Sequence, residues 1–274
     1  MEMTVRSTER RLRKKNKYHI VSNIILILVS LLMIFPFYWM LITSLKPEDD
    51  LLVIPPQLFP RHFTLENYKS VFEFSSDRIS IFGAFGNTLK IALPVTFGAL
   101  LTCSLAAFAF AKIPFTGSKF CFRCLIGTMM VPGQITLVPL YMIFAKINWV
   151  DSTLPLIIPS IMVNAYGTFL IYSFILGVPD SYIEAAKSEG APLILIYIRI
   201  VIPLCTPVLI TQGLFIFLGA WNDFMGALIY LDSESKFTLS LFLNMYRSQY
   251  NINWGNIMAA STLAIFPVII LYLF

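Results

Sequence analysis

Long apolar runs constrain this chain more than any other feature. Six can be drawn, at about 20–45, 85–111, 120–145, 154–176, 202–231 and 256–274. Each approaches or exceeds the roughly 20 apolar residues that a helix needs to cross the hydrocarbon core of a bilayer. The chain is 57% hydrophobic and 13% charged, against about 25% charged residues in soluble domains. These numbers exclude a soluble globular protein and predict an all-α, multi-pass membrane protein with six transmembrane helices, because lipid forces every backbone group to pair internally.

The N-terminal residues 1–19 form a basic tail ahead of the first apolar run. The tail holds seven Lys or Arg and two Glu, which accounts for the whole net charge of +5. A basic run next to a span is typical of a cytoplasmic anchor that contacts anionic lipid, and it is poor evidence for nucleic-acid binding. The apolar run that follows is too long for a cleaved signal peptide, so we expect a retained first span.

The placement of Lys and Arg sets the expected orientation. With the N-terminus in the cytoplasm, twelve Lys or Arg lie on the inner side and eight on the outer side. This arrangement puts the connection at about 179–204 in the cytoplasm. The connection at 46–84 lies outside, is too polar to span, and has a short helix expected at 63–72.

Nothing in the sequence predicts catalysis, and we expect the chain not to be an enzyme. A GxxxxGK[ST] phosphate loop is absent, so we expect no ATP bound by this chain through that motif, and no other cofactor. Cys121 and Cys124 form a single CxxC, which is weak evidence for zinc or redox chemistry, and we expect no metal site.

The third apolar run carries a helix-weakening stretch, Pro132, Gly133 and Gln134, with Pro139 further on. Proline removes a backbone donor and clashes with the preceding turn. Broken helices are tolerated in lipid where neighbours or a cavity satisfy the freed groups. Two interpretations stay open: this stretch lines a translocation pathway, or it is a packing kink.

The fifth run ends with Trp221, Asn222 and Asp223. A carboxylate within an apolar span is expensive and indicates function by default, as part of a pathway or a gate. The alternative is a structural hydrogen bond between helices. Trp221 is a candidate for stacking on a sugar ring or for an interfacial anchor.

The segment 179–204 places charge between two spans. Ser181 and Glu184 have the spacing of a capping box, which makes Ser181 a candidate N-cap. Gly190 suits a helix C-terminal turn, and Pro192 suits the start of the next helix. The pattern predicts a short amphipathic helix joined by an elbow to the next span. It fits docking into a groove on a soluble partner, and it equally fits an ordinary interfacial elbow.

This segment resembles the EAA loop of bacterial ABC-importer permeases. The family pattern is EAA, three residues, Gly, nine residues, then Ile-x-Leu-Pro. The matching positions are Glu184, Ala185, Ala186, Gly190, Ile200 and Pro203, with Ile202 in place of Leu. The resemblance implies a coupling helix that docks on an ATPase subunit, and it assigns the coupling role to these residues together with Ser181 and Tyr182.

The stretch 217–231, "FLGAWNDFMGALIYL", narrows the resemblance. It is similar to the fifth-span signature of carbohydrate-uptake permeases of the maltose type, over about 20–274. The resemblance implies a type I ABC-importer fold in the bacterial inner membrane, and one half of a pathway for a saccharide. It also implies a second permease that is a different chain, two ATPase copies that bind ATP and Mg²⁺, and an extracytoplasmic solute-binding protein. Such permeases usually continue into a short cytoplasmic tail, and this sequence stops at Phe274, so contacts by a tail are not carried over.

Three other functions compete with a saccharide importer. The EAA pattern also suits an ABC permease for an amino acid, a peptide or an anion. A secondary transporter that needs no ATPase would show inverted repeats and buried ion sites, and we find no repeat. A membrane scaffold without transport is the third. We therefore expect a basic tail at 1–19 and a transmembrane permease domain at 20–274 that contains the coupling segment 179–204.

Overall fold

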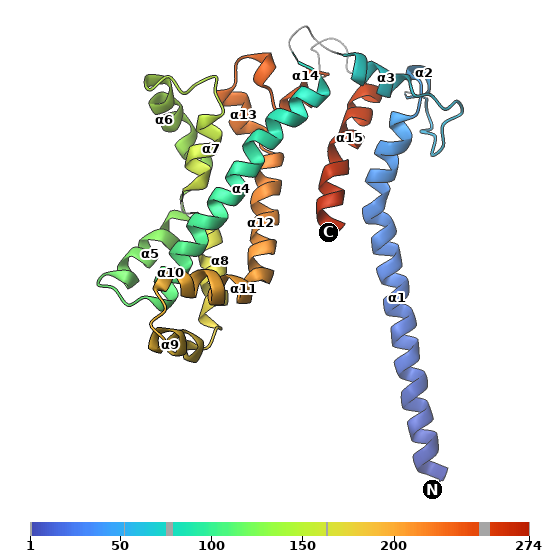
Figure 1. The fold of residues 1–274 in the computed structure, drawn as a ribbon. Coiled ribbons are helices and arrows are strands. Elements are labelled where there is room, and N and C mark those ends of the chain that lie inside the picture. The colour runs from blue at the N-terminus through green and yellow to red at the C-terminus, as the bar shows by residue number, and fades with distance from the viewer. Residues whose placement is uncertain (1, 52, 75–78, 163, 247–252, 274) are drawn as a thin grey trace. The chain divides into compact units, whose positions relative to one another are not determined.

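The computed structural model describes residues 2–51, 53–74, 79–162, 164–246 and 253–273; for residues 2–20 it describes only the backbone. The described chain is built of helices (Figure 1). Their bounds are α1 (Glu2–Ser44), α2 (Glu48–Leu51), α3 (Glu66–Glu73), α4 (Ile81–Lys112), α5 (Ser118–Thr128), α6 (Gly133–Lys146), α7 (Leu154–Ile161), α8 (Ala165–Leu176), α9 (Asp180–Ser188), α10 (Leu193–Ile196), α11 (Ile202–Leu204), α12 (Thr206–Trp221), α13 (Met225–Tyr230), α14 (Leu239–Met245) and α15 (Trp254–Leu273). A π-helical turn, η1 (Tyr197–Val201), joins α10 to α11, and a 3-10 turn, η2 (Glu234–Lys236), precedes α14.

The predicted all-α membrane architecture is confirmed. Within the described residues, four helical segments are long and apolar enough to span a bilayer: Val21–Ser44, Ile81–Lys112, Leu154–Leu176 and Trp254–Leu273. Two further pairs pass the same test but are sharply bent, which brings the possible spans to six. The predicted short outer helix appears as α3, three residues later than expected.

Three of the predicted runs are broken. The third run bends by 95° between α5 and α6, at the stretch that was predicted to weaken the helix, and Pro132 is the extended residue directly before α6. Pro139 lies inside α6 without ending it. At the start of the fifth run, the helical segment Leu193–Leu204, which contains α10 and α11, is bent by 82° relative to α12. Pro207 lies in the first turn of α12, where backbone N–H groups have no partner within the helix, so the missing N–H of proline costs no hydrogen bond.

The fourth and fifth runs contain further breaks. The fourth divides into α7 and α8, and Asn164 caps α8 by accepting a hydrogen bond from the Gly167 N–H at 2.9 Å. The fifth was predicted to continue to Leu231, but α12 ends at Trp221 and α13 follows as a separate helix. Hydropathy averaged over a window does not detect such breaks, because most residues on both sides of them are apolar.

The chain divides into two compact units. The first comprises residues 1–71 and 249–265, and the second comprises residues 72–248 and 266–274. In the second unit α4 is the central helix, and it packs against α7, α8, α12 and α14 (Figure 1). Small side chains along α4, including the buried Ala92, Ala99 and Ala107, allow neighbouring backbones to approach closely. A Cβ at Gly98 would lie 2.7 Å from Ile161, so this glycine is required for contact with α7.

In the first unit, the side chains of residues 21–37 on α1 are exposed, which fits a helix that faces lipid or a partner chain. The end of α1 is tied to α3 by Asn67, whose amide donates to the carbonyls of Ser44 and Lys46 at 2.9 and 2.8 Å. Lys46 is buried, donates to the Gln57 carbonyl at 2.6 Å and lies 4.7 Å from the ring centre of Trp39. Burial lowers the pKa of Lys46, and nearby Asp50 opposes that shift.

Candidate functional site

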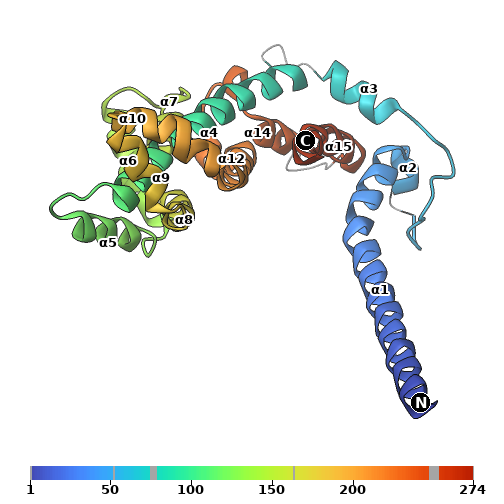
Figure 2. The same cartoon turned by 60° about the horizontal axis from the view of Figure 1, so that its bottom comes forward.

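The predicted coupling segment forms a short helix, α9, at one end of the second unit, opposite the end that holds α13 (Figure 1). Figure 2, with this end turned forward, shows α9 beside α10. The prediction of Ser181 as N-cap is wrong. The helix begins at Asp180 directly after Pro179, and no side chain caps it. Pro179 has an extended backbone, so the chain turns into the helix one residue before Ser181, and Ser181 lies within the first turn.

Gly190 ends α9 as predicted. Its φ of +80° lies in the left-handed region, where a side chain is strained. The Gly190 N–H donates to the Lys187 carbonyl at 2.9 Å, and the Ala191 N–H donates to the Ala186 carbonyl at 3.0 Å. These two bonds form a Schellman turn, which satisfies the last carbonyls of the helix. No atom lies within 4 Å of a Cβ built at Gly190, so the backbone conformation, not lack of space, requires glycine there.

One face of α9 is fixed to the core of the second unit. Ile183 is 4% exposed and belongs to the same apolar cluster as Phe108, Ile171 and Tyr197, and Ala186 packs against that cluster. This cluster joins α9 to α4, α8 and the π-helical turn. A displacement of α9 would therefore move or strain these helices, since packed interiors do not deform freely.

A buried lysine from α4 holds the start of α9. The Lys112 ammonium donates to the Val178 carbonyl at 2.7 Å and to Asp180 Oδ1 at 2.6 Å. The Lys112 side chain is 7% exposed and that of Asp180 is 74% exposed. Lys112 is 68 residues from Asp180, and it was missed in the sequence because only the fold brings it to α9.

The opposite face of α9 is free. Tyr182, Glu184, Ala185 and Lys187 are exposed. Within the part of the chain that the structure describes, no hydrogen bond or ion pair is made by the Glu184 side chain. A groove of about 1090 Å³ runs between α9 and the start of α5, and its walls include Lys119, Arg123 and Lys187. The exposed face thus offers an unpaired carboxylate flanked by cations to a partner.

The elbow after Gly190 is anchored on α4 as well. The Tyr197 hydroxyl is hydrogen-bonded to Ser104 Oγ at 2.6 Å, and its ring lies 5.5 Å from that of Phe108. Ile200 is half-buried against the same apolar cluster, and Pro203 is exposed in α11. The predicted rigid connection between α9 and the next long helix therefore has a structural basis.

A second cavity lies among the long helices of this unit. It has a volume of about 350 Å³ and is bordered by α4, α7, α8 and α12. Asp223, one of the predicted pathway residues, lines it. The Asp223 carboxylate accepts a hydrogen bond from the Gly226 N–H at 3.0 Å. Gln212, Asn164 and Ser160 also line this cavity and were missed, although polar residues within apolar runs were the signal that identified Asp223.

The other predicted pathway residues lie elsewhere. Trp221 is 4% exposed and stacks on Phe217 at 5.4 Å, so its ring faces are occupied by aromatic neighbours. Asn222 is exposed and donates to the Leu218 carbonyl of its own helix at 2.9 Å. Pro132, Gly133 and Gln134 are exposed at the bend before α6 and border neither cavity. Their pathway roles stay predictions.

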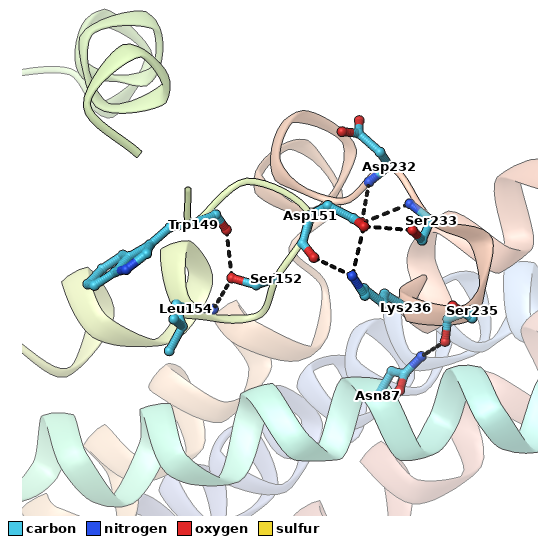
Figure 3. A network of polar contacts seen from close by, with 9 residues as sticks. All are labelled: Asn87, Trp149, Asp151, Ser152, Leu154, Asp232, Ser233, Ser235 and Lys236. Carbon is cyan, nitrogen blue, oxygen red and sulfur yellow. Dashed lines mark hydrogen bonds and ion pairs between the residues drawn. The ribbon is translucent and has the colours of Figure 1, made fainter. Parts of the chain in front are cut away.

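The end of the unit opposite α9 is closed by a polar cluster (Figure 3). Asp151 accepts hydrogen bonds from the N–H groups of Asp232 and Ser233 at 3.0 and 2.8 Å, and from Lys236 Nζ at 2.7 Å. Bonds from Lys236 and Ser233 hold the pKa of Asp151 well below its ordinary value. The cluster ties the loop before α7 to the loop after α13.

The described residues contain no group of three or more His, Cys, Asp or Glu side chains placed to hold a metal ion. Cys121 and Cys124 are free and exposed on α5, and Cys103 and Cys205 are free and buried.

Comparison with known proteins adds the family context. Residues 95–274 match the family model described as "Binding-protein-dependent transport system inner membrane component". The arabinooligosaccharides transport system permease protein AraQ of Bacillus subtilis is 31% identical over 94% of this chain and 91% of that protein. The diacetylchitobiose uptake system permease protein DasC of Streptomyces coelicolor is 26% identical over 92% of this chain and 90% of that protein.

The fold has a solved counterpart. A chain from the crystal structure of a bacterial ABC transporter that imports the acidic polysaccharide alginate superposes with a TM-score of 0.82. The match covers 95% of each chain at 21% identity. This likeness confirms the predicted type I importer-permease fold.

Proposed function

Because this chain belongs to the family of binding-protein-dependent transport system inner membrane components, we propose that it forms half of the translocation pathway of an ATP-driven saccharide importer. The chain is a multi-pass inner-membrane permease subunit and not an enzyme. An importer permease works with a second permease, an ATPase and a solute-binding protein. The proposal is that this chain binds no cofactor and that ATP and Mg²⁺ lie on the ATPase.

The saccharide part of the proposal is supported by the relatives. AraQ is named for arabinooligosaccharides and DasC for diacetylchitobiose, and both match over at least nine-tenths of this chain. A shared cargo class is the simplest account of two saccharide permeases that match at full length.

The observation that carries the coupling role is the division of α9 into two faces. Ile183 and Lys112 fix one face to α4 and α8, and the other face, with Glu184 and Lys187, is exposed and unpartnered within the described residues. ATP-driven closure of the ATPase dimer would press on the exposed face. The packed face would pass the displacement to α8 and, through the elbow, to α12. This is a two-state element biased by a ligand that binds elsewhere.

The proposal also fixes an orientation, with α9 and the N-terminus in the cytoplasm and the Asp151 cluster outside. The balance of Lys and Arg supports this side for α9. An ATPase is reached only from the cytoplasm, which agrees with the exposed face of α9 as its docking surface.

Site-directed cross-linking tests the coupling role. The exposed native cysteines, Cys121 and Cys124, are first replaced by serine. Single cysteines are then placed at the exposed Ala185, and at Lys146 in α6 as a control remote from α9. The account predicts that position 185 forms a cross-link to an ATPase subunit in native membranes, and that position 146 does not.

The same membranes provide a second readout. A tag on this chain should recover a second permease and an ATPase by mass spectrometry. Recovery of the chain alone, together with equal cross-linking at both positions, would contradict the proposed function.

A further inference from the structure

The span Leu154–Leu176 is interrupted close to its middle, between α7 and α8. Two carbonyls at the interruption are satisfied by α4. Thr102 Oγ1 donates to the Ile161 carbonyl at 2.7 Å, and Cys103 Sγ donates to the Asn164 carbonyl at 3.6 Å. Irregular backbone at membrane depth is tolerated where it is buried in protein or lines a cavity. This break meets the second condition, since Asn164 is exposed and borders the cavity of about 350 Å³.

Gln212 on α12 faces the break with an unpaired amide oxygen. The residue is 2% exposed, and its Oε1 has no hydrogen-bond partner among the described residues. The fold makes room for this amide, because a Cβ at Gly167 would lie 2.7 Å from Gln212 Nε2. A buried amide without a partner is costly, and a structural role would have supplied one. The unpaired amide borders the same cavity as Asn164, so the missing partner would enter through that cavity.

The chemistry of the cavity selects a class of ligand. Ser160, Asn164 and Tyr166 add hydroxyl and amide groups beside Gln212. Asp223 supplies the single charged side chain on the wall, and no Lys, Arg or His lines it among the described residues. A carboxylate on the wall disfavours a second negative charge beside it. The wall is thus suited to hydroxyl groups and unsuited to an anion.

We infer that this cavity binds the hydroxyl groups of a neutral saccharide and that Gln212 is its specificity-determining residue. The inference rests on the proposed function and extends it, because the proposed function leaves the charge of the cargo open. It separates this chain from a carrier of acidic saccharides. The size of the cavity, at the lower end of the roughly 300–1,000 Å³ range of ligand pockets, fits one end of an oligosaccharide.

The test uses the complex recovered with a tag on this chain, without the solute-binding protein, so that the binding protein cannot select the cargo. Three probes are added at millimolar concentration: maltotriose, arabinotriose and an alginate trisaccharide. We expect at least one neutral trisaccharide to raise the melting temperature of the complex and the acidic one to leave it unchanged.

Gln212→Leu should weaken the binding of the neutral probe about tenfold, because the variant loses one or two hydrogen bonds to the saccharide. Thr211→Val is the matched control, because Thr211 is exposed on the same helix and its hydroxyl donates to the Pro207 carbonyl. Gln212→Met is a second test with an unbranched side chain. A purely structural glutamine predicts the reverse, since replacing an unpaired buried amide with an apolar group is neutral or stabilising and would leave binding intact.

The inference is overturned if the alginate trisaccharide stabilises the complex as much as the neutral probes, or if both Gln212 variants bind like the parent. Stabilisation by none of the three probes also overturns it. Failure of the proposed function is distinguishable, because the second permease and the ATPase would then be missing from the purified complex.

Discussion

Replacing Lys112 with methionine tests how α9 is held to α4. Methionine keeps an unbranched side chain, one atom shorter than lysine, and removes both hydrogen bonds of the ammonium. The bond to the Val178 carbonyl is partly buried and charge-assisted, and such bonds contribute about 1.5–3 kcal/mol. The ion pair with Asp180 contributes at most about 1 kcal/mol, because the carboxylate is 74% exposed. The carbonyl bond should therefore dominate.

The two contributions are separated by variants. Lys112→Met should weaken the docking of α9 by about 2 kcal/mol, a roughly 30-fold rise in its local opening equilibrium. Asp180→Asn keeps the Val178 bond and should cost less than about 1 kcal/mol, or about fivefold. Lys119→Met is the matched control, because Lys119 lines the same groove with an exposed side chain.

Hydrogen exchange of the α9 amides in the purified complex measures this opening, and the ratio of ATP hydrolysed to solute imported measures its consequence. Lys112→Met should speed exchange in α9 and raise the ratio. Equal exchange in Lys112→Met and the parent would refute the anchoring argument. An equal effect in Lys112→Met and Asp180→Asn would show that the ion pair, and not the carbonyl bond, holds the helix.

Three further predictions follow from local geometry. Gly190→Ala should destabilise the turn by about 1–2 kcal/mol, because alanine is strained at the positive φ, and should raise the ratio of ATP hydrolysed to solute imported. Gly190→Asn should have a smaller effect, because asparagine tolerates this conformation better. A ratio equal to that of the parent in both variants would contradict the role of the turn. Asp151 has a lowered pKa in the folded protein, so its ionised carboxylate stabilises the fold fully at any pH above its unfolded-state pKa of about 3.9. That stabilisation is lost only as the pH falls through the pKa of the folded state. Protection of the Ser233 amide should thus be equal at pH 5 and pH 8 and lower in Asp151→Asn, and a fall between pH 8 and pH 5 would be contrary evidence. Gly226→Ala places a Cβ against the Asp223 carboxylate that lines the cavity and should lower the melting temperature and uptake, whereas Gly86→Ala, in open space, should change neither.

Local patterns in the sequence predicted the position of α9 well. The spacing from Glu184 to Gly190 and the positive φ of that glycine belong to one short stretch, so sequence reasoning reaches both. The start of the helix was misplaced by two residues, because the conformation of Pro179 decided it and the capping pattern at Ser181 did not.

Long-range contacts and the breaks in the fourth and fifth apolar runs were missed. Lys112 meets α9 only after folding, across 68 residues. The break before Asn164 and the end of α12 at Trp221 lie within long, mostly apolar runs, where hydropathy averaged over a window stays high. The polar residues beside them, Asn164, Asn222 and Asp223, were not interpreted as helix ends. Gln212 shows what was overlooked: a polar side chain within an apolar run carries the same signal as Asp223, and its significance appears only when its partners are counted.

The most direct test of the central claim is solute uptake into proteoliposomes that contain the complex purified through this chain, with its solute-binding protein added outside. The account predicts uptake of a saccharide that requires ATP on the side of α9 and does not depend on ion gradients. Uptake that continues without ATP and follows a proton or sodium gradient would contradict it.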